Sequence, residues 1–217
     1  MSLPLFRLTD LDFSYPGQPV LLRGVDLTIR EQERVLLTGD NGSGKTTLLK
    51  LLVGLLKPSS GQVLLSGEEP GRQSPELYRS LFFSQQNSVD NLFGLCPRHD
   101  LQVWQIAHPE RLDSAGLETN DDTLARNWDR PFSALSAGEL QALALLYLPR
   151  FLDKFWILDE PTAGLDAERK ARFHALCQQK MGQSHGMLVV SHDPGLPASL
   201  FDRKLLLQDG QLMETSS

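Results

Sequence analysis

The stretch Gly39-Asp40-Asn41-Gly42-Ser43-Gly44-Lys45-Thr46 fits the phosphate-loop pattern GxxxxGK[ST]. It lies between an apolar run over Val35–Thr38, which predicts a strand, and a leucine-rich segment over Lys45–Leu56, which predicts a helix. Glycines let backbone N–H groups turn toward phosphate oxygens, and the positive end of the helix adds to the attraction. We expect Lys45 to reach the β- and γ-phosphates and the Thr46 hydroxyl to ligate Mg²⁺. A glycine-rich turn with an unrelated lysine is the structural alternative.

A second strand is expected to deliver two carboxylates. The run Phe155–Leu158 is wholly apolar, which is typical of a strand covered on both faces, and Asp159 and Glu160 follow it. Beside a phosphate loop, Asp159 would hold Mg²⁺, directly or through water, and Glu160 would accept a proton from the attacking water. Adjacent carboxylates after an apolar run are common, so this interpretation depends on the phosphate loop.

Three further polar residues end expected strands. His192 follows Met187–Ser191, and it could donate a hydrogen bond to the γ-phosphate or only form a turn. Gln85 follows Leu81–Ser84 and could contact Mg²⁺ or the water, although its neighbour Gln86 leaves this assignment open. Tyr15 ends the first strand and offers a ring on which adenine could stack, or it is a half-buried strand residue.

The pentapeptide Leu135-Ser136-Ala137-Gly138-Glu139 can be interpreted in two ways. Ser136 and Glu139 have the S-x-x-E spacing of a capping box, which would start a helix before the apolar run Leu140–Leu148. A helix amino terminus with a serine hydroxyl is also a good site for phosphate. Both interpretations use one geometry, so the residues alone do not choose between them.

Size, charge and order of elements restrict the class of protein. The 217 residues suffice for one core with an inserted lobe. A net charge of −6 argues against broad binding to nucleic acid or an acidic membrane face. Apolar runs are far shorter than the roughly 20 residues that span a bilayer. No secretory signal is visible in Met1–Arg7, so we expect a cytoplasmic protein, with Cys96 and Cys177 as reduced thiols.

Strands alternate with helices at both ends of the chain, which predicts an α/β core with a mostly parallel sheet. Expected strands also cover Leu5–Ser14, Val25–Ile29 and Val63–Leu65. A helix is expected to start at Ser74-Pro75, and another to cover 167–181. Mixed sequence with expected helices over 100–107 and 138–148 marks an inserted helical subdomain. Its expected range is about 86–152, and the core would take about 1–85 and 153–217.

In these motifs and their order, the chain resembles the ATP-binding cassette family over nearly its whole length. The resemblance implies a phosphate-loop NTPase core with an antiparallel β subdomain and an inserted helical subdomain. It implies ATP and Mg²⁺ as ligands, and a head-to-tail homodimer or heterodimer with two ATP molecules sandwiched. Each ATP would lie between one subunit's phosphate loop and the other's signature, which is Leu135–Glu139 here. The resemblance implies that ATP is bound by Tyr15, Gly39, Asp40, Asn41, Gly42, Ser43, Gly44, Lys45, Thr46 and Thr47. It implies that catalysis uses Glu160, His192 and Gln85, and that the metal is held by Thr46, Gln85 and Asp159. It implies that the ATP of the other subunit is contacted by Leu135, Ser136, Ala137, Gly138, Glu139 and Asp166.

The chain departs from the family pattern in three places. Ala137 stands where a glycine is common, and Glu139 stands where glutamine is usual. The segment Gln141–Tyr147 contains no arginine, whereas similar proteins usually carry one or more there. The catalytic set is intact, so we predict active ATP hydrolysis.

The resemblance predicts the energy-supplying subunit of a membrane transporter, peripheral on the inner face of the cell membrane. In the family, the region after the glutamine docks a helix of the integral membrane subunit. Asn91–Leu95 and Arg98–Trp104 could form such a groove, or Phe93 and Trp104 could be core. The chain is loosely similar to energy-coupling factor and cobalt-type importer cassettes. A soluble cassette ATPase acting on nucleic acid or the ribosome is the second hypothesis, although no nucleic-acid partner is expected, and a phosphate-loop kinase or GTPase is the third.

Overall fold

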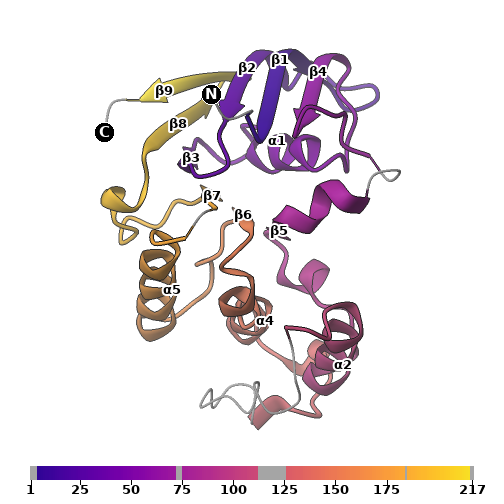
Figure 1. Cartoon of the computed structure of the whole chain (residues 1–217), viewed down its shortest axis with the longest axis vertical. Helices are drawn as coiled ribbons and strands as arrows, with labels where there is room; N and C mark the ends of the chain where they lie inside the picture. The colour runs from indigo at the N-terminus through magenta and orange to yellow at the C-terminus, as the bar shows by residue number, and fades with distance from the viewer. Residues whose placement is uncertain (1–3, 72–74, 112–125, 184, 216–217) are drawn as a thin grey trace.

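The computed structural model describes residues 4–71, 75–111, 126–183 and 185–215. Its strands form a three-stranded and a six-stranded sheet, and helices α2, α4 and α5 lie at the opposite end from the smaller sheet (Figure 1). This arrangement confirms the predicted α/β fold with a parallel and an antiparallel sheet. The limits of the helical subdomain stay a prediction, because the described part lacks residues 112–125.

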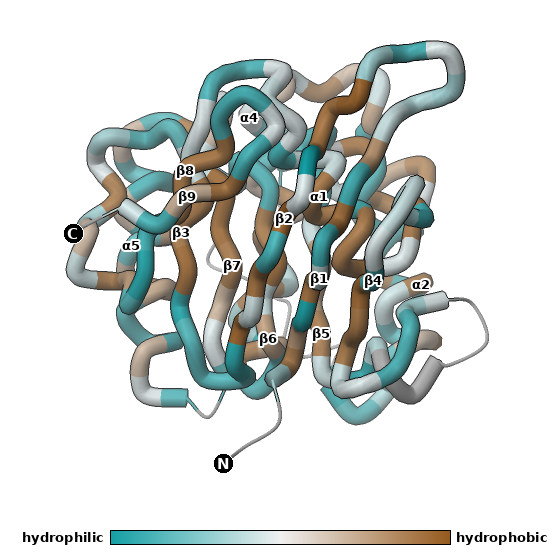
Figure 2. Tube along the Cα trace, turned by 90° about the horizontal axis from the view of Figure 1, so that it is seen from above, coloured by the Kyte–Doolittle hydropathy of each residue, from teal (hydrophilic) through white to brown (hydrophobic). Residues whose placement is uncertain are grey.

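The smaller sheet is antiparallel, with strand order β2-β1-β4. Buried and exposed side chains alternate along most of β1 and β2, because successive side chains point to opposite faces. Figure 2 shows the same alternation as changes between teal and brown along β1 and β2. Its strands are β1 Phe6–Phe13, β2 Leu22–Ile29 and β4 Ser60–Leu65.

The larger sheet has the order β5-β6-β7-β3-β8-β9, and all neighbours are parallel except β8 and β9. Because β5, β6, β7 and β3 run in one direction, the residues that follow these four strands lie at one edge of the sheet. That edge carries the site. The six strands are β3 Arg34–Thr38, β5 Leu81–Ser84, β6 Phe155–Asp159, β7 Met187–Val190, β8 Arg203–Gln208 and β9 Gln211–Thr215.

Helices cover the larger sheet from both sides. The α-helices are α1 Lys45–Leu52, α2 Pro97–Ala107, α4 Ala137–Leu145 and α5 Ala167–Lys180. Short 3₁₀ helices lie in the connections between strands and helices: η1 Pro75–Ser80, η2 Ser88–Asn91, η3 Phe132–Ala134, η4 Leu148–Phe151 and η5 Ala198–Leu200. Within the described ranges, no helix is both long enough and apolar enough to cross a membrane.

Strand β6 separates two parts of the core. Phe155 and Ile157 face the cluster that α1 and the two sheets build, whereas Trp156 and Leu158 face the cluster under α5 and η4. All five residues of β6 are buried, as the apolar run predicts. The strand is therefore fixed from both faces, and it presents its carboxyl end at a defined position.

Several predicted bounds are wrong for local reasons. The helix expected over 45–56 ends at Leu52, because the chain turns at Gly54, which has a φ of +68°. The helix expected over 138–148 ends at Leu145, because Pro149 has no N–H to donate to the Leu145 carbonyl. The helix expected to start at Ser74 is a 3₁₀ helix from Pro75, and Ser74 lies outside the described residues.

Candidate active site

The phosphate loop turns sharply between β3 and α1 because its glycines adopt backbone angles that side chains disfavour. Gly39, Gly42 and Gly44 have φ values of +145°, +82° and +106°. Gly39 also lies against β8, where an added Cβ would be 2.2 Å from the Leu207 carbonyl oxygen. The loop therefore needs glycine at Gly39 for both conformation and space.

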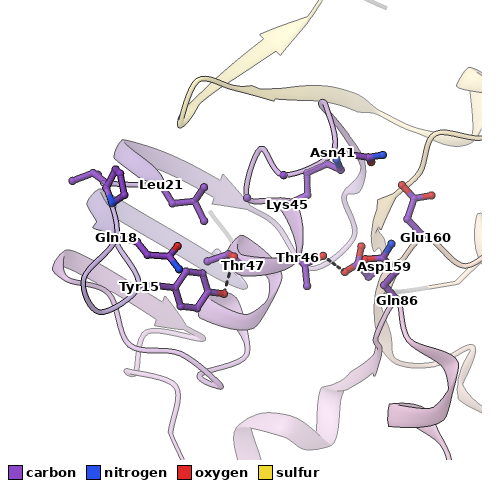
Figure 3. A pocket seen from close by; sticks show the side chains of 14 residues that line it. Tyr15, Gln18, Leu21, Asn41, Lys45, Thr46, Thr47, Gln86, Asp159 and Glu160 are labelled. Carbon is purple, nitrogen blue, oxygen red and sulfur yellow. Dashed lines mark hydrogen bonds between the residues drawn. The ribbon is translucent and has the colours of Figure 1, made fainter.

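The last two residues of the phosphate loop are fixed by hydrogen bonds, and Figure 3 shows the one that joins Thr46 to the end of β6. Lys45 is buried, and its Nζ donates to the carbonyls of Gly39 and Asp40 at 2.6 and 2.8 Å. The Thr46 hydroxyl donates to Asp159 Oδ2 at 2.6 Å. The loop, the first turn of α1 and the acidic strand are thus in direct contact.

A cavity of about 510 Å³ runs from the first strand to the acidic strand. Tyr15 lies at one end of it (Figure 3), where its ring contacts Phe13 edge-on at 4.9 Å and its hydroxyl pairs with Thr47 Oγ1 at 3.1 Å. Asp159 and Glu160 lie at the other end. The cavity is lined by Tyr15, Gln18, Pro19, Val20, Leu21, Asn41, Gly42, Gly44, Lys45, Thr46, Thr47, Gln86, Asp159 and Glu160.

Both carboxylates at the end of β6 have perturbed acidity. Burial raises the pKa of Asp159, although the Thr46 hydroxyl and the Lys45 charge lower it in part. Burial also raises the pKa of Glu160, whose side chain is 14% exposed. A carboxylate with a raised pKa is a better proton acceptor near neutral pH.

Glu160 is held in a strained conformation beside His192. Its φ is +50°, which is uncommon for a residue with a side chain, and its N–H donates to the Val190 carbonyl at 2.9 Å. Oε2 accepts a hydrogen bond from the His192 backbone N–H at 3.3 Å, and Oε1 lies 3.5 Å from His192 Nε2. The ends of β6 and β7 therefore bring these two predicted residues together.

The structure distinguishes the two glutamines after β5. Gln86 lines the cavity near Asp159 (Figure 3), whereas Gln85 is not among the lining residues. Asn91 holds the Gln85 backbone, since its side chain accepts from the Gln85 N–H at 2.7 Å and donates to the Gln85 carbonyl at 2.8 Å. The geometry favours Gln86 for the contact that the sequence assigned to Gln85.

The signature residues form the capping box that the sequence predicts. Ser136 Oγ accepts from the Glu139 N–H at 3.3 Å, and Glu139 Oε2 accepts from the Ser136 N–H at 2.9 Å. Hydrogen bonding to Ser136 lowers the pKa of the Glu139 carboxyl. Asp166 caps α5 by accepting from the Arg169 N–H at 2.9 Å. None of the residues from Leu135 to Glu139, nor Asp166, lines the cavity of the same chain.

The helix without arginine makes other contacts. Gln141 is 2% exposed, and its Nε2 donates to the Pro161 carbonyl at 2.9 Å. Tyr147 follows α4 and donates its hydroxyl to Asp100 Oδ2 at 2.7 Å. Sequence reasoning missed both contacts, because they join segments far apart in the chain. The sequence analysis also missed Val20 and Leu21, which line the cavity. The proline that precedes them, Pro19, was the available indication of a turn at this point of the sequence.

A phosphate loop, a buried acidic strand and a strained carboxylate beside a histidine define a nucleotide-hydrolysing protein of the phosphate-loop class. The family model for ABC transporters matches residues 22–163, which is more than half of the chain. The chain therefore belongs to the ABC transporter family, and it is an ATP-binding, ATP-hydrolysing component of transport systems.

Known proteins cover most of this chain. The aliphatic sulfonates import ATP-binding protein SsuB of Pseudomonas putida is 35% identical over 207 residues, which are 90% of this chain and 70% of that protein. The energy-coupling factor transporter ATP-binding protein EcfA of Methanothermobacter thermautotrophicus is 29% identical over 216 residues, which are 96% and 70%. The chain spans only 42% of a longer ABC transporter ATP-binding protein of Treponema denticola, at 32% identity over 97% of this chain.

Solved structures show the same fold. The cbiO1 protein from Clostridium perfringens, part of the ABC transporter complex cbiONQ, superposes with a TM-score of 0.72 at 24% identity, over 97% of this chain and 87% of that chain. The ATP-binding cassette MJ0796, a dimer bound to ADP and Pi, superposes with a TM-score of 0.75 at 24% identity, over 97% and 98%.

Proposed function

We propose that this chain hydrolyses Mg²⁺-ATP as one half of a head-to-tail dimer and drives an integral membrane subunit. The observation that carries the proposal is the convergence of Lys45, Thr46, Asp159 and Glu160 at one cavity, at the carboxyl edge of the parallel sheet. The partner can be a second copy or a different cassette.

The residues at the cavity fit a nucleotide and Mg²⁺. Backbone N–H groups of residues 39–44 and the Lys45 ammonium would hold the phosphates, and Tyr15 would stack on the adenine. Thr46, Asp159 and Gln86 offer hard oxygen atoms, which Mg²⁺ prefers, and the Thr46–Asp159 contact already places two of them together. Bound Mg²⁺ would neutralise charge that develops on the phosphate oxygens.

Glu160 is the proposed general base, and His192 the residue that braces the γ-phosphate. The raised pKa of Glu160 supports proton acceptance, and the 3.5 Å between Glu160 Oε1 and His192 Nε2 supports a joint role for the two side chains. Gln86, in place of the expected Gln85, would orient the attacking water.

The signature would act in trans. Residues 135–139 stand at the amino end of α4 and do not line the cavity of their own chain, which supports a role at the nucleotide of the other subunit. Asp166 lies shortly after Glu160 in the chain and would help align the opposing site. The Ala137 methyl and the Glu139 carboxylate are the features that would slow closure.

Exposed apolar side chains on the helical region support the membrane partner. Phe93, Leu95 and Ile106 are 64%, 76% and 84% exposed, although all are large apolar side chains. Trp104, by contrast, stacks on Tyr147 at 4.7 Å and contributes to the core. These side chains would contact a helix of the membrane subunit, which would place the protein on the inner face of the membrane.

The first experiment tests catalysis with Glu160→Gln. Loss of the base should lower phosphate release by about 10²–10⁴-fold and trap ATP-bound dimers, which light scattering detects. Glu69→Gln changes an exposed carboxylate and serves as the control. Ser136→Arg should keep ATP binding by the monomer but abolish dimer closure. Normal turnover in Glu160→Gln would contradict the assignment of the base.

The second experiment identifies the partner. Tagged protein from gently solubilised membranes should retain an integral membrane protein, and Phe93→Ser with Ile106→Ser should release it. Met213→Ser, an exposed apolar residue on β9, is the control. Recovery of ribosomes or nucleic acid without a membrane protein would favour the soluble-ATPase hypothesis instead.

A further inference from the structure

A buried amide on α4, the helix that the signature begins, contacts residues 161–164, which follow Glu160 in the same chain and are called the catalytic loop below. Gln141 lies in the second turn of α4, and its Nε2 donates to the carbonyl of Pro161, the residue directly after Glu160. The side chain is 2% exposed and does not line the nucleotide cavity. Gln141 therefore touches the catalytic loop from behind, away from the nucleotide.

A second contact joins the same two segments. A Cβ built on Gly138, in the first turn of α4, would be only 2.6 Å from the Gly164 carbonyl oxygen. Gly164 itself has a φ of +75°. The backbone of the signature thus rests directly on the backbone of the loop, and α4 contacts both ends of residues 161–164.

The position of Glu160 depends on what holds its neighbours. Its φ of +50° is an unfavourable conformation that persists only where surrounding contacts impose it. On one side, β6 and the Val190 carbonyl fix its backbone. On the other side, the residue that follows is Pro161, which has no N–H to donate, and the Gln141 amide binds its carbonyl.

We propose that Gln141 is a positioning residue that links the signature of each chain to the Glu160 carboxylate of the same chain. Because Ser136 and Gln141 lie on one short rigid helix, nucleotide contact at Ser136 would act on the loop through the amide. Each ATP site of the dimer would then depend on occupation of the other. This inference rests on the proposed function, since it requires Ser136 to contact the other subunit's nucleotide.

Gln141→Met tests the link, because methionine keeps the length and fills the space but cannot donate a hydrogen bond. Turnover should fall about tenfold, as expected when a buried hydrogen bond is lost in the transition state. The KM for ATP should stay nearly unchanged, since nothing at the nucleotide changes. The Hill coefficient for ATP should fall below the wild-type value but stay above one, because ATP-driven closure of the dimer still requires both sites.

Tyr147→Phe is the matched control. It also removes a buried hydrogen bond just after α4, but the lost partner is Asp100 and not the catalytic loop. This variant should lose thermal stability while it keeps turnover and the Hill coefficient. A role of Gln141 in stability alone would make the two variants behave alike.

Gln141→Glu adds a pH readout. A carboxyl group can donate to the Pro161 carbonyl only when it is protonated. Turnover relative to the wild type should therefore rise as the pH falls, whereas a folding defect would follow the melting temperature. If Gln141→Met does not fold, this pH profile decides the question alone.

A second assay separates positioning from closure. In a Glu160→Gln background, Gln141→Met should still form ATP-driven dimers, because the amide acts after the signature engages. The proposal is overturned if Gln141→Met keeps the turnover and the cooperativity of the wild type. It is also overturned if the wild-type protein itself has a Hill coefficient of one. Failure of the proposed function would look different: the wild-type chain would form no dimers with ATP, or Ser136→Arg would still form them.

Discussion

Tyr147→Phe removes one hydroxyl from a buried polar group that anchors the turn carrying Phe93. Asp100 is 1% exposed, and its Oδ1 accepts from the N–H groups of Phe93 and Gly94 at 2.6 and 3.3 Å. Its Oδ2 accepts from the Tyr147 hydroxyl at 2.7 Å. The carboxylate thus holds the turn that carries Phe93, and the variant takes away the donor to one of its two oxygens.

The size of the loss follows from these contacts. A hydrogen bond to a buried charged group contributes about 1.5–3 kcal/mol, and Oδ1 keeps both of its backbone donors, so we expect a loss of about 2 kcal/mol. For a domain of this size that corresponds to a melting temperature lower by about 4–8 °C. Tyr78→Phe is the control, because the Tyr78 hydroxyl makes only a 3.4 Å contact to the Gly71 carbonyl.

The loss should depend on pH in a defined direction. Burial raises the pKa of Asp100, and the hydrogen bond from the Tyr147 hydroxyl is the largest of the contacts that partly lower it. Loss of this hydroxyl in the variant therefore raises the Asp100 pKa further. A carboxyl with a raised pKa keeps its proton in the fold where the unfolded chain has lost it, so stability falls as the pH rises from the usual value to the raised one. The loss should be largest near neutral pH and smallest in acid.

Urea unfolding of the wild type and both variants, near pH 7 and at several lower pH values, measures these differences. The reasoning is refuted if Tyr147→Phe loses no more stability than Tyr78→Phe. It is also refuted if the loss grows as the pH falls, because that sign would mean that the Tyr147 hydroxyl favours the protonated form of Asp100 and not the carboxylate.

Local chemistry explains what the sequence could predict. The phosphate loop is contiguous, so its function follows from eight residues and the elements on either side. The carboxylates after β6 and the histidine after β7 need only one more inference, because parallel strands end at the same edge of a sheet. Glu160 and His192 are therefore neighbours, although 32 positions separate them.

Contacts made only in the assembled fold explain what the sequence could not predict. Strands β8 and β9 begin with charged or polar residues, and only pairing with β3 shows that Leu205 and Leu207 are core. The choice between Gln85 and Gln86 depends on Asn91, whose side chain turns the backbone after β5. Neither the pairing of β8 with β3 nor the hydrogen bonds of Asn91 can be predicted from the hydropathy of the sequence.

Two further variants test the backbone of the loop and a buried cation. Gly39→Ala should cost about 3 kcal/mol of stability and abolish ATP binding, because its Cβ would be 2.2 Å from the Leu207 carbonyl oxygen. Gly42→Ala, with open space at its Cβ, should cost only about 1–2 kcal/mol; equal losses in calorimetry would contradict the steric argument. Lys180 donates to the Leu152 carbonyl and lies 5.1 Å from the Trp156 ring, and burial lowers its pKa to about 8. Since the unfolded chain keeps this proton up to the usual value of 10.5, stability should rise as the pH increases above 8. Lys180→Met should abolish that rise, and an unchanged slope in the variant would show that another group causes it.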